Sequence, residues 1–405
     1  MVTSASEPTG RLNWLRNPPD FSLVQGGPLF QLLRRAHLSD DAMGLQRKRI
    51  IVIALLVWLP LLALSALEGR VLDGRAAVPF LLDLEVHTKF LVVVPLLIVA
   101  EIVVHRRMRP VVRQFLERQL IPEKAMTRFE AIIASAFRLR NSVLAEVLLI
   151  AFVYGVGILI VWRQYVGLHA ATWYATPSAE GSTLSLAGMW YGYVSMPIFQ
   201  FLLCRWYFRL FIWARFLWQV SRIELSLVPT HPDRVGGLGF LSGTTHAFSV
   251  LAVAHGVLLA GPLANRIFFL GAALPQFKAE IAVMAVFLLC VVLGPLLVFA
   301  PQLAQAKRTG LYEYGTLAER YVRDFDAKWL RGGAPADEAL VGSGDIQSLA
   351  DLANSYEVVR AMRIAPITKR AALGLAAAAL VPVAPLLLTM MPLEELLKTL
   401  FSMLL

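Results

Sequence analysis

The pattern of apolar and polar positions divides the chain into long apolar runs separated by charged segments. Seven runs approach or reach the roughly 17 to 25 residues that a helix needs to cross a membrane. They cover 50–67, 90–104, 142–162, 184–218, 245–263, 281–300 and 371–391. The second run is short, and we expect 81–84 to extend it. The pattern therefore predicts an all-α membrane protein, a polytopic helical bundle of about seven spans.

Two polar segments predict amphipathic helices instead of linkers. In 106–140, Val112, Phe115 and Leu116 recur at helical spacing, and Pro122 divides the segment into two helices. Segment 301–370 holds ten Lys/Arg and nine Asp/Glu, so it is nearly neutral, and it has helical patterns at 311–330 and 346–362. We expect both segments to lie on the cytoplasmic side of the membrane.

These elements predict four parts in the chain. Residues 1–49 form a loosely ordered cytoplasmic arm with a short amphipathic piece at 29–38. Residues 50–300 form the bundle of about six spans, with the cytoplasmic helices 106–140 and the loop 226–243. Residues 301–370 are a cytoplasmic helical segment. Residues 371–405 supply the last span and an amphipathic C-terminal helix that is too short to span.

Composition supports the membrane class and gives an orientation. Hydrophobic residues make up 57% and charged residues only 16%, against about 25% charged in soluble domains. The net charge of +10 fits cytoplasmic loops rich in Lys and Arg better than nucleic-acid binding, since no reading module is present. Segment 105–140 has nine Lys/Arg and three Glu, so we expect this segment and the N-terminus to lie in the cytoplasm. With this orientation, Arg266 and Lys278 lie outside.

The run "HPDRVGGLGF", residues 231–240, is polar and glycine-rich between two apolar runs. Three interpretations compete. It is a rigid elbow that reverses the chain, because Pro232 disfavours helix at His231 and the glycines allow unusual turns. It is a ligand or ion site, with glycine amides forming a nest for an anion. It is a metal or acid–base site on His231 and Asp233. The binding candidates are His231, Asp233, Arg234, Gly236, Gly237 and Gly239.

Ionisable residues within the spans are the second group of candidates, because such residues are costly in a bilayer and are paired or functional. Arg205 and Arg209 lie four residues apart, hence on one helix face. Glu101 and Glu146 lie at a similar depth, so we expect at least one arginine to contact one of them. His255 lies in mid-span, either bonded to a neighbouring helix or relaying protons.

The motifs "PTHPDRVGGLGFL" and "GSGDIQSLADLANSYEVVRAMR" (residues 342–363) resemble a family of bacterial integral membrane proteins that has no assigned activity. The similarity covers most of the chain. It implies a multi-pass protein of the bacterial inner membrane and carries no functional residue over to this sequence.

Three classes of function remain open. The first is a channel or transporter for a small ion or solute, with Arg205 and Arg209 lining or gating its path. The second is a membrane-embedded enzyme acting on a lipid-linked substrate through His231 and Asp233, and the third is a non-catalytic scaffold or sensor. The sequence shows no HExxH or GxSxG motif and only two cysteines, so transport is preferred over catalysis. We expect no cofactor, metal or nucleic acid. We expect the lipid bilayer as a partner, and the sequence leaves open whether the protein forms a homo-oligomer.

Overall fold

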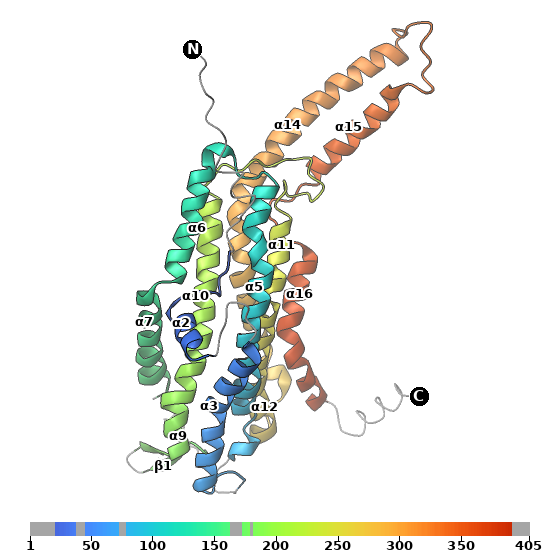
Figure 1. Cartoon of the computed structure of the whole chain (residues 1–405). Coiled ribbons are helices and arrows are strands. Elements are labelled where there is room, and N and C mark those ends of the chain that lie inside the picture. The colour runs from blue at the N-terminus through green and yellow to red at the C-terminus, as the bar shows by residue number, and fades with distance from the viewer. Residues whose placement is uncertain (1–20, 38–44, 73–77, 163–171, 179–180, 391–405) are drawn as a thin grey trace, which may run out of the picture.

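The computed structural model describes residues 21–37, 45–72, 78–162, 172–178 and 181–390. It is 78% helical, which confirms the all-α class. The strands β1 (Ala175–Ser178) and β2 (Gly181–Leu184) form one short antiparallel hairpin. The helices run along a common direction and make an elongated bundle (Figure 1).

Five helical runs are long and apolar enough to cross a membrane. They are α3 (Gln46–Leu67), α4–η2–α5 (Leu84–Glu117), α11–η6–α12 (Phe240–Leu270), η7 to η9 (Leu274–Leu330) and α16–η10 (Lys369–Met390). A sixth results if two bent helices form one broken span. These are η3–α6 (Glu123–Arg140) and the helix that starts with α7 (Val143–Phe152) and continues into η4 as far as Gly157, and they meet at 46°. The run α9–η5–α10 (Leu186–Val220) is also long, but it carries Gln200 and several arginines. The membrane class is thus supported, whereas seven spans remain a prediction.

The breaks between these helices follow from local chemistry. Asp83, Ser142, Ser185 and Thr368 each accept a hydrogen bond at the start of a helix from a backbone N–H three residues on, as N-cap residues do. Gly271, with φ of 66°, ends α12 in the left-handed conformation that favours glycine. Pro122 lies in extended backbone and separates α5 from α6, as the sequence predicted.

The bundle has two distinct ends. At the loop end, the loop 226–243 meets the turn between α5 and α6. Ser226 N donates to Leu120 O at 2.9 Å, and Arg118 donates to Gly237 O at 3.0 Å. The strand end carries β1, β2 and the start of α9 (Figure 1). The turn between α5 and α6, the loop and the base of segment 301–370 thus share one end of the bundle. That this end is cytoplasmic stays a prediction.

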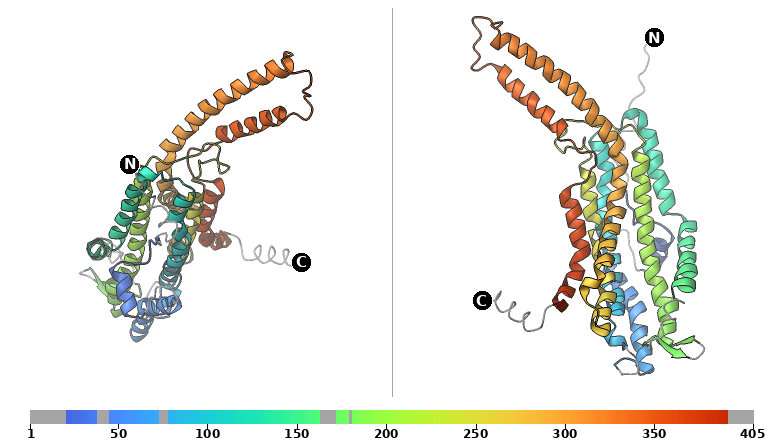
Figure 2. Two further views of the ribbon diagram at one scale, coloured as in Figure 1. Left: turned by 45° about the horizontal axis from the view of Figure 1, so that its top comes forward. Right: turned by 180° about the vertical axis from the view of Figure 1, so that it is seen from behind.

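Segment 301–370 forms a helical arm that leaves the bundle at the loop end (Figure 2). It consists of α14 (Ala300–Phe325), η9 (Asp326–Leu330) and α15 (Gly344–Arg360). The predicted pattern 311–330 lies within α14 and η9, and the predicted pattern 346–362 coincides with α15 up to Arg360. The arm is not a separate segment, however, because α14 continues the helical run that starts at Leu274.

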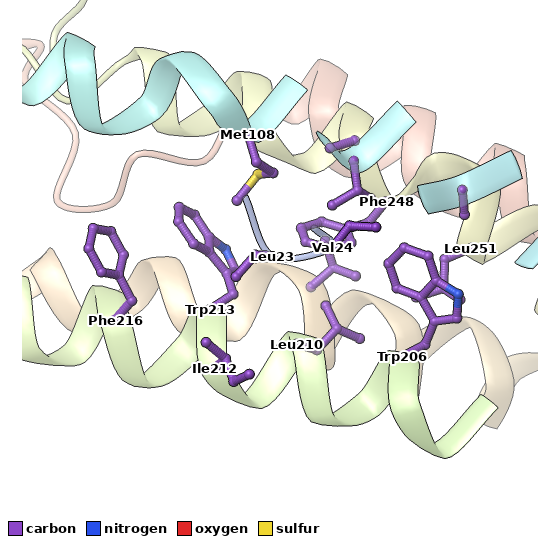
Figure 3. Close-up of a cluster of buried hydrophobic side chains, with 14 of the residues drawn as sticks. Leu23, Val24, Met108, Trp206, Leu210, Ile212, Trp213, Phe216, Phe248 and Leu251 are labelled. Carbon is purple, nitrogen blue, oxygen red and sulfur yellow. The ribbon is translucent and has the colours of Figure 1, made fainter. Parts of the chain in front are cut away.

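The N-terminal arm is not loosely ordered in the part that is described. Phe21 to Val24 are buried in the core, and Figure 3 shows Leu23 and Val24 between Met108 of α5 and Trp213 of α10. Helix α2 (Pro28–Arg35) follows, with Phe30 and Leu33 buried. The expectation failed because residues 21–24 are too few to show a periodicity, although four buried positions suffice to fill the space between two helices.

The last predicted element, the amphipathic helix at the C-terminus, lies beyond Met390 and outside the described residues.

Candidate functional site

A partly enclosed pocket of about 210 Å³ lies inside the strand end of the bundle. Helices from four parts of the chain form its walls together with the segment 172–174 that precedes β1. Its polar side chains are Asp83, Glu85, Lys89, Thr172, Gln200 and Asn265, and its aromatic side chains are Trp173, Tyr174 and Tyr191. Concave sites with a few converging polar groups and aromatic walls are typical of small-molecule binding.

Lys89 is the central charge of this pocket. Its side chain is 7% exposed, and its ammonium group donates to Glu85 at 2.8 Å and to Tyr191 Oη at 3.3 Å. It also lies 5.9 Å from the ring centres of Tyr191 and Phe199, within the range of cation–π attraction. An ammonium has three donors, so one N–H remains for a further acceptor within the pocket.

Asp83 connects three walls of the pocket through hydrogen bonds. Its carboxylate accepts from Trp173 Nε1 and from Asn265 Nδ2, both at 2.8 Å. Asn265 Oδ1 in turn accepts from Leu84 N at 3.0 Å. The start of α4, Trp173 in the segment before β1, and helix α12 are therefore linked by one buried carboxylate, which gives the pocket a fixed shape.

Three of the walls contain π-helical turns at the positions that face the pocket. These are η2 (Thr88–Val93), η4 (Val153–Trp162) and η5 (Tyr191–Ser195), which contribute Lys89, Gly157, Tyr191 and Gly192 to the lining. A π-helical turn interrupts the regular backbone ladder, and such turns occur frequently at functional sites. Their convergence marks this pocket as the leading candidate site.

Sequence reasoning missed this pocket. The run 81–84 appeared only as an extension of a span, and Lys89 was not considered as an intramembrane charge. A signal was present, because Glu85 and Lys89 stand four residues apart, directly before an apolar run. Such a pair lies on one helix face, and an ionisable pair within a span is a candidate site.

A second buried cluster lies nearer the loop end, between α3, α5, α7 and α10. Arg209 donates to Glu101 at 2.7 Å, and Arg49 contacts the other oxygen of that carboxylate at 2.6 Å. Arg205 lies 3.6 Å from Glu146. We expected at least one of the two arginines to contact Glu101 or Glu146, and this is confirmed. Arg49, which sequence reasoning placed before the first span, joins the cluster.

The N-terminal segment contacts this cluster directly. Leu29 N donates to Glu146 Oε2 at 2.7 Å, at the first turn of α2. Helix N-termini favour carboxylates because their first N–H groups lack intrahelical partners. The contact holds α2 against α7.

His255, the fifth residue of the predicted network, makes other contacts. Its Nε2 lies 2.6 Å from Tyr207 Oη, and its Nδ1 lies 2.8 Å from Leu251 O, one turn before it on the same helix. The first bond joins α12 to α10, as expected for a histidine bonded to a neighbouring helix.

The 231–240 loop is organised around Asp233. Its carboxylate accepts from the backbone N–H groups of Val235, Gly237 and Gly239 at 2.8 to 3.1 Å. Partial burial raises the pKa of this carboxyl. The three N–H groups and nearby His231 lower it by more than burial raises it, so the pKa lies below its ordinary value. The amide nest that could have received an external anion is therefore filled by Asp233 itself.

The other predicted binding residues of this loop help to form the same turn. Gly236 and Gly237 have φ of 63° and 99°, and Arg234 has φ of 58°. The two glycines thus adopt the unusual turn conformations that the sequence led us to expect. His231 Nδ1 lies 3.0 Å from Asp233 Oδ1. Arg363 donates its backbone N–H to Arg234 O and its guanidinium to Asp233 O, which fastens the loop to the end of the arm. This geometry favours the elbow interpretation.

A metal site at this loop would need further ligands beside His231 and Asp233. Within the described residues, no group of three or more His, Cys, Asp or Glu side chains is arranged to hold a metal ion. The pair His231 and Asp233 therefore gains no third ligand of these types from that part of the chain.

Comparisons of the chain with protein-family models, with curated proteins and with solved structures found no match.

Proposed function

We propose that the chain is a membrane transporter or channel for a small polar solute or ion, with the strand-end pocket as its solute site. The observation that carries this proposal is the pocket itself: buried Lys89 with Glu85 and Asp83, between three π-helical turns, inside a bundle with five helical runs long and apolar enough to cross a membrane. Charged side chains at such positions are expensive in a bilayer and mark solute or ion paths.

The order of features along the helices supports a path with two parts. On α10, Gln200 of the pocket is followed by Arg205 and Arg209 of the charge cluster, and on the α4–α5 run Lys89 is followed by Glu101. Leu23 and Val24 fill the space between α5 and α10 toward the loop end (Figure 3). In this proposal, the described conformation is open to the strand end and closed toward the loop end.

The charge bias of the polar segments gives the orientation. The basic segment 105–140 and the N-terminus lie in the cytoplasm, so the pocket opens on the opposite side of a bacterial inner membrane. The arm α14–α15 then extends into the cytoplasm.

Osmotic swelling of proteoliposomes tests the proposal across several classes of solute. Vesicles with and without protein are transferred into iso-osmotic potassium chloride, glycine, arginine hydrochloride, sodium glutamate and glucose, and swelling is followed by light scattering. At least one solute should enter faster through the protein. Met196→Trp, which fills the pocket, should abolish that entry, whereas Val283→Trp, at a position 68% exposed on α13 (Lys278–Leu293), should not. If no solute enters faster than in protein-free vesicles, the proposal is wrong.

A further inference from the structure

The charge cluster between α3, α5, α7 and α10 is not neutral. Among the described residues, Arg49, Arg205 and Arg209 pair with two carboxylates, Glu101 and Glu146, so these five side chains carry one positive charge in excess. All five are buried. A buried charge without a partner is strongly unfavourable, so this excess favours an anion beside the cluster.

Arg49 is the member with unused hydrogen-bonding capacity. The residue is 3% exposed, and one of its terminal nitrogens contacts Glu101 at 2.6 Å. Its Nε and Nη2 have no hydrogen-bond partner among the described residues. A guanidinium has five N–H donors in a planar fork that suits a carboxylate.

An apolar groove leads from Arg49 to the outside of the bundle. It has a volume of about 490 Å³ and lies between α2, α3, α7 and α10, a size within the usual range of ligand sites. Arg49 and Glu146 supply its charged wall, and the rest of its lining is almost wholly apolar, including Leu32, Leu56, Val147 and Ile150. These four side chains are between 47% and 62% exposed, so the groove opens sideways toward the hydrocarbon of the bilayer.

We propose that this groove binds a long-chain carboxylate, with its carboxylate at Arg49 and its hydrocarbon chain along the groove toward the bilayer. The charge excess and the unused N–H groups select the anion, and the apolar lining selects the chain. The polar end of the groove is its inner end, which suits a single-chain acid that enters head first. A phospholipid keeps its headgroup at the membrane surface and would present its chains to the groove in the opposite sense.

The site does not depend on the strand-end pocket, which different residues line. A fatty acid bound here would contact α2 through Leu32 and Leu33 and α10 through Phe201 and Leu202. It would thus join the N-terminal segment to the helix that carries Arg205 and Arg209.

Equilibrium binding of tritiated palmitate to the purified full-length protein in detergent tests the proposal. One palmitate per chain should bind. Unlabelled palmitate should compete at least about tenfold better than its uncharged methyl ester or than phosphatidylglycerol, since the ester loses the charged contact. Val147→Trp, which fills the groove from an exposed position, should weaken binding by about tenfold or more. Val283→Trp, an equally lipid-facing change on α13, should leave it unchanged.

Arg49→Gln should also weaken binding, and its thermal unfolding is measured alongside to separate lost affinity from lost folding. The Val147→Trp arm decides the matter if Arg49→Gln does not fold. Equal competition by acid and ester, or unchanged binding in Val147→Trp, would overturn the proposal. Stronger competition by phosphatidylglycerol than by palmitate would overturn the assignment to a single-chain acid.

Discussion

Arg209 donates to Glu101 at 2.7 Å across the interface between α10 and α5, and Arg49 of α3 contacts the same carboxylate. One buried glutamate therefore holds three helices together through two guanidinium groups. Both arginines and the glutamate are at most 3% exposed, so none of these charges is relieved by water. Their mutual dependence gives the first prediction.

Glu101→Gln should lower the free energy of unfolding by about 3 to 5 kcal/mol, because it leaves two buried guanidinium groups without a counter-charge. Glu146→Gln should cost less, since Arg205 lies 3.6 Å away and the glutamine can still accept from Leu29 N. Thermal or chemical unfolding in detergent measures both. A smaller loss for Arg205→Gln with Glu146→Gln than for either single change would identify that pair as structural. Equal losses for Glu101→Gln and Glu146→Gln would contradict the ranking.

The loop around Asp233 should give the protein an acid-sensitive step. The pKa of Asp233 lies below its ordinary value in the folded state, so its ionised form stabilises the fold at neutral pH. That contribution is lost as the pH falls below the ordinary aspartate range, about 3.9, through the lowered pKa.

Asp233→Asn should therefore destabilise the protein at neutral pH by about 1 to 3 kcal/mol, since up to three backbone N–H groups lose a carboxylate acceptor. The difference between variant and wild type should shrink as the pH is lowered. Thermal unfolding across this pH range measures it. A difference that stays constant with pH would show that the charge of Asp233 does not matter.

The N-terminal segment should stabilise the bundle as a core element. Leu23→Ala should cost about 2 to 5 kcal/mol, because Leu23 is 2% exposed and the deletion leaves a cavity between α5 and α10. Leu32→Ala on α2 is the matched control, since Leu32 is 62% exposed. Unfolding in detergent compares the two. Equal stabilities would place residues 21–24 outside the core.

The tip of the arm should behave as a local unit. Asp345 accepts from Lys328 Nζ at 2.9 Å and from Trp329 Nε1 at 2.8 Å, and these bonds lower its pKa. Asp345→Asn should raise amide hydrogen exchange in residues 326–346 and leave the bundle unchanged, because the contact is exposed and lies far along the arm. A change in exchange within α5 or α10 would show that the arm is coupled to the bundle.

The helical class, the positions of most long apolar helices and a contact between these arginines and Glu101 or Glu146 could be predicted from the sequence. Apolar runs, and charges within them, are local signals. The role of Arg49 could not. It stands in the basic run before the first span, and only the packing of α3 against α5 brings it to Glu101.

The pocket and the inserted N-terminal segment were missed for a related reason. Asp83, Trp173 and Asn265 lie about 90 residues apart in sequence, and no spacing rule joins them. Leu23 and Val24 are two ordinary apolar residues near a glycine pair, and their burial depends on a gap between helices that form elsewhere. The glycines of the loop, in contrast, indicated an unusual turn directly, and Gly236 and Gly237 have positive φ there.

The central claim is that a solute enters the membrane through the strand-end pocket. Its most direct test is the effect of a membrane-impermeant thiol reagent on Gln200→Cys, with Cys204 and Cys290 replaced by serine, in vesicles of known orientation. Thr183→Cys marks the strand end, and Glu224→Cys, whose parent side chain is 83% exposed, marks the loop end. The account predicts that Gln200→Cys reacts from the same side as Thr183→Cys and that the modification blocks the solute entry seen by swelling. Reaction only from the side of Glu224→Cys, or modification that leaves solute entry unchanged, would contradict it.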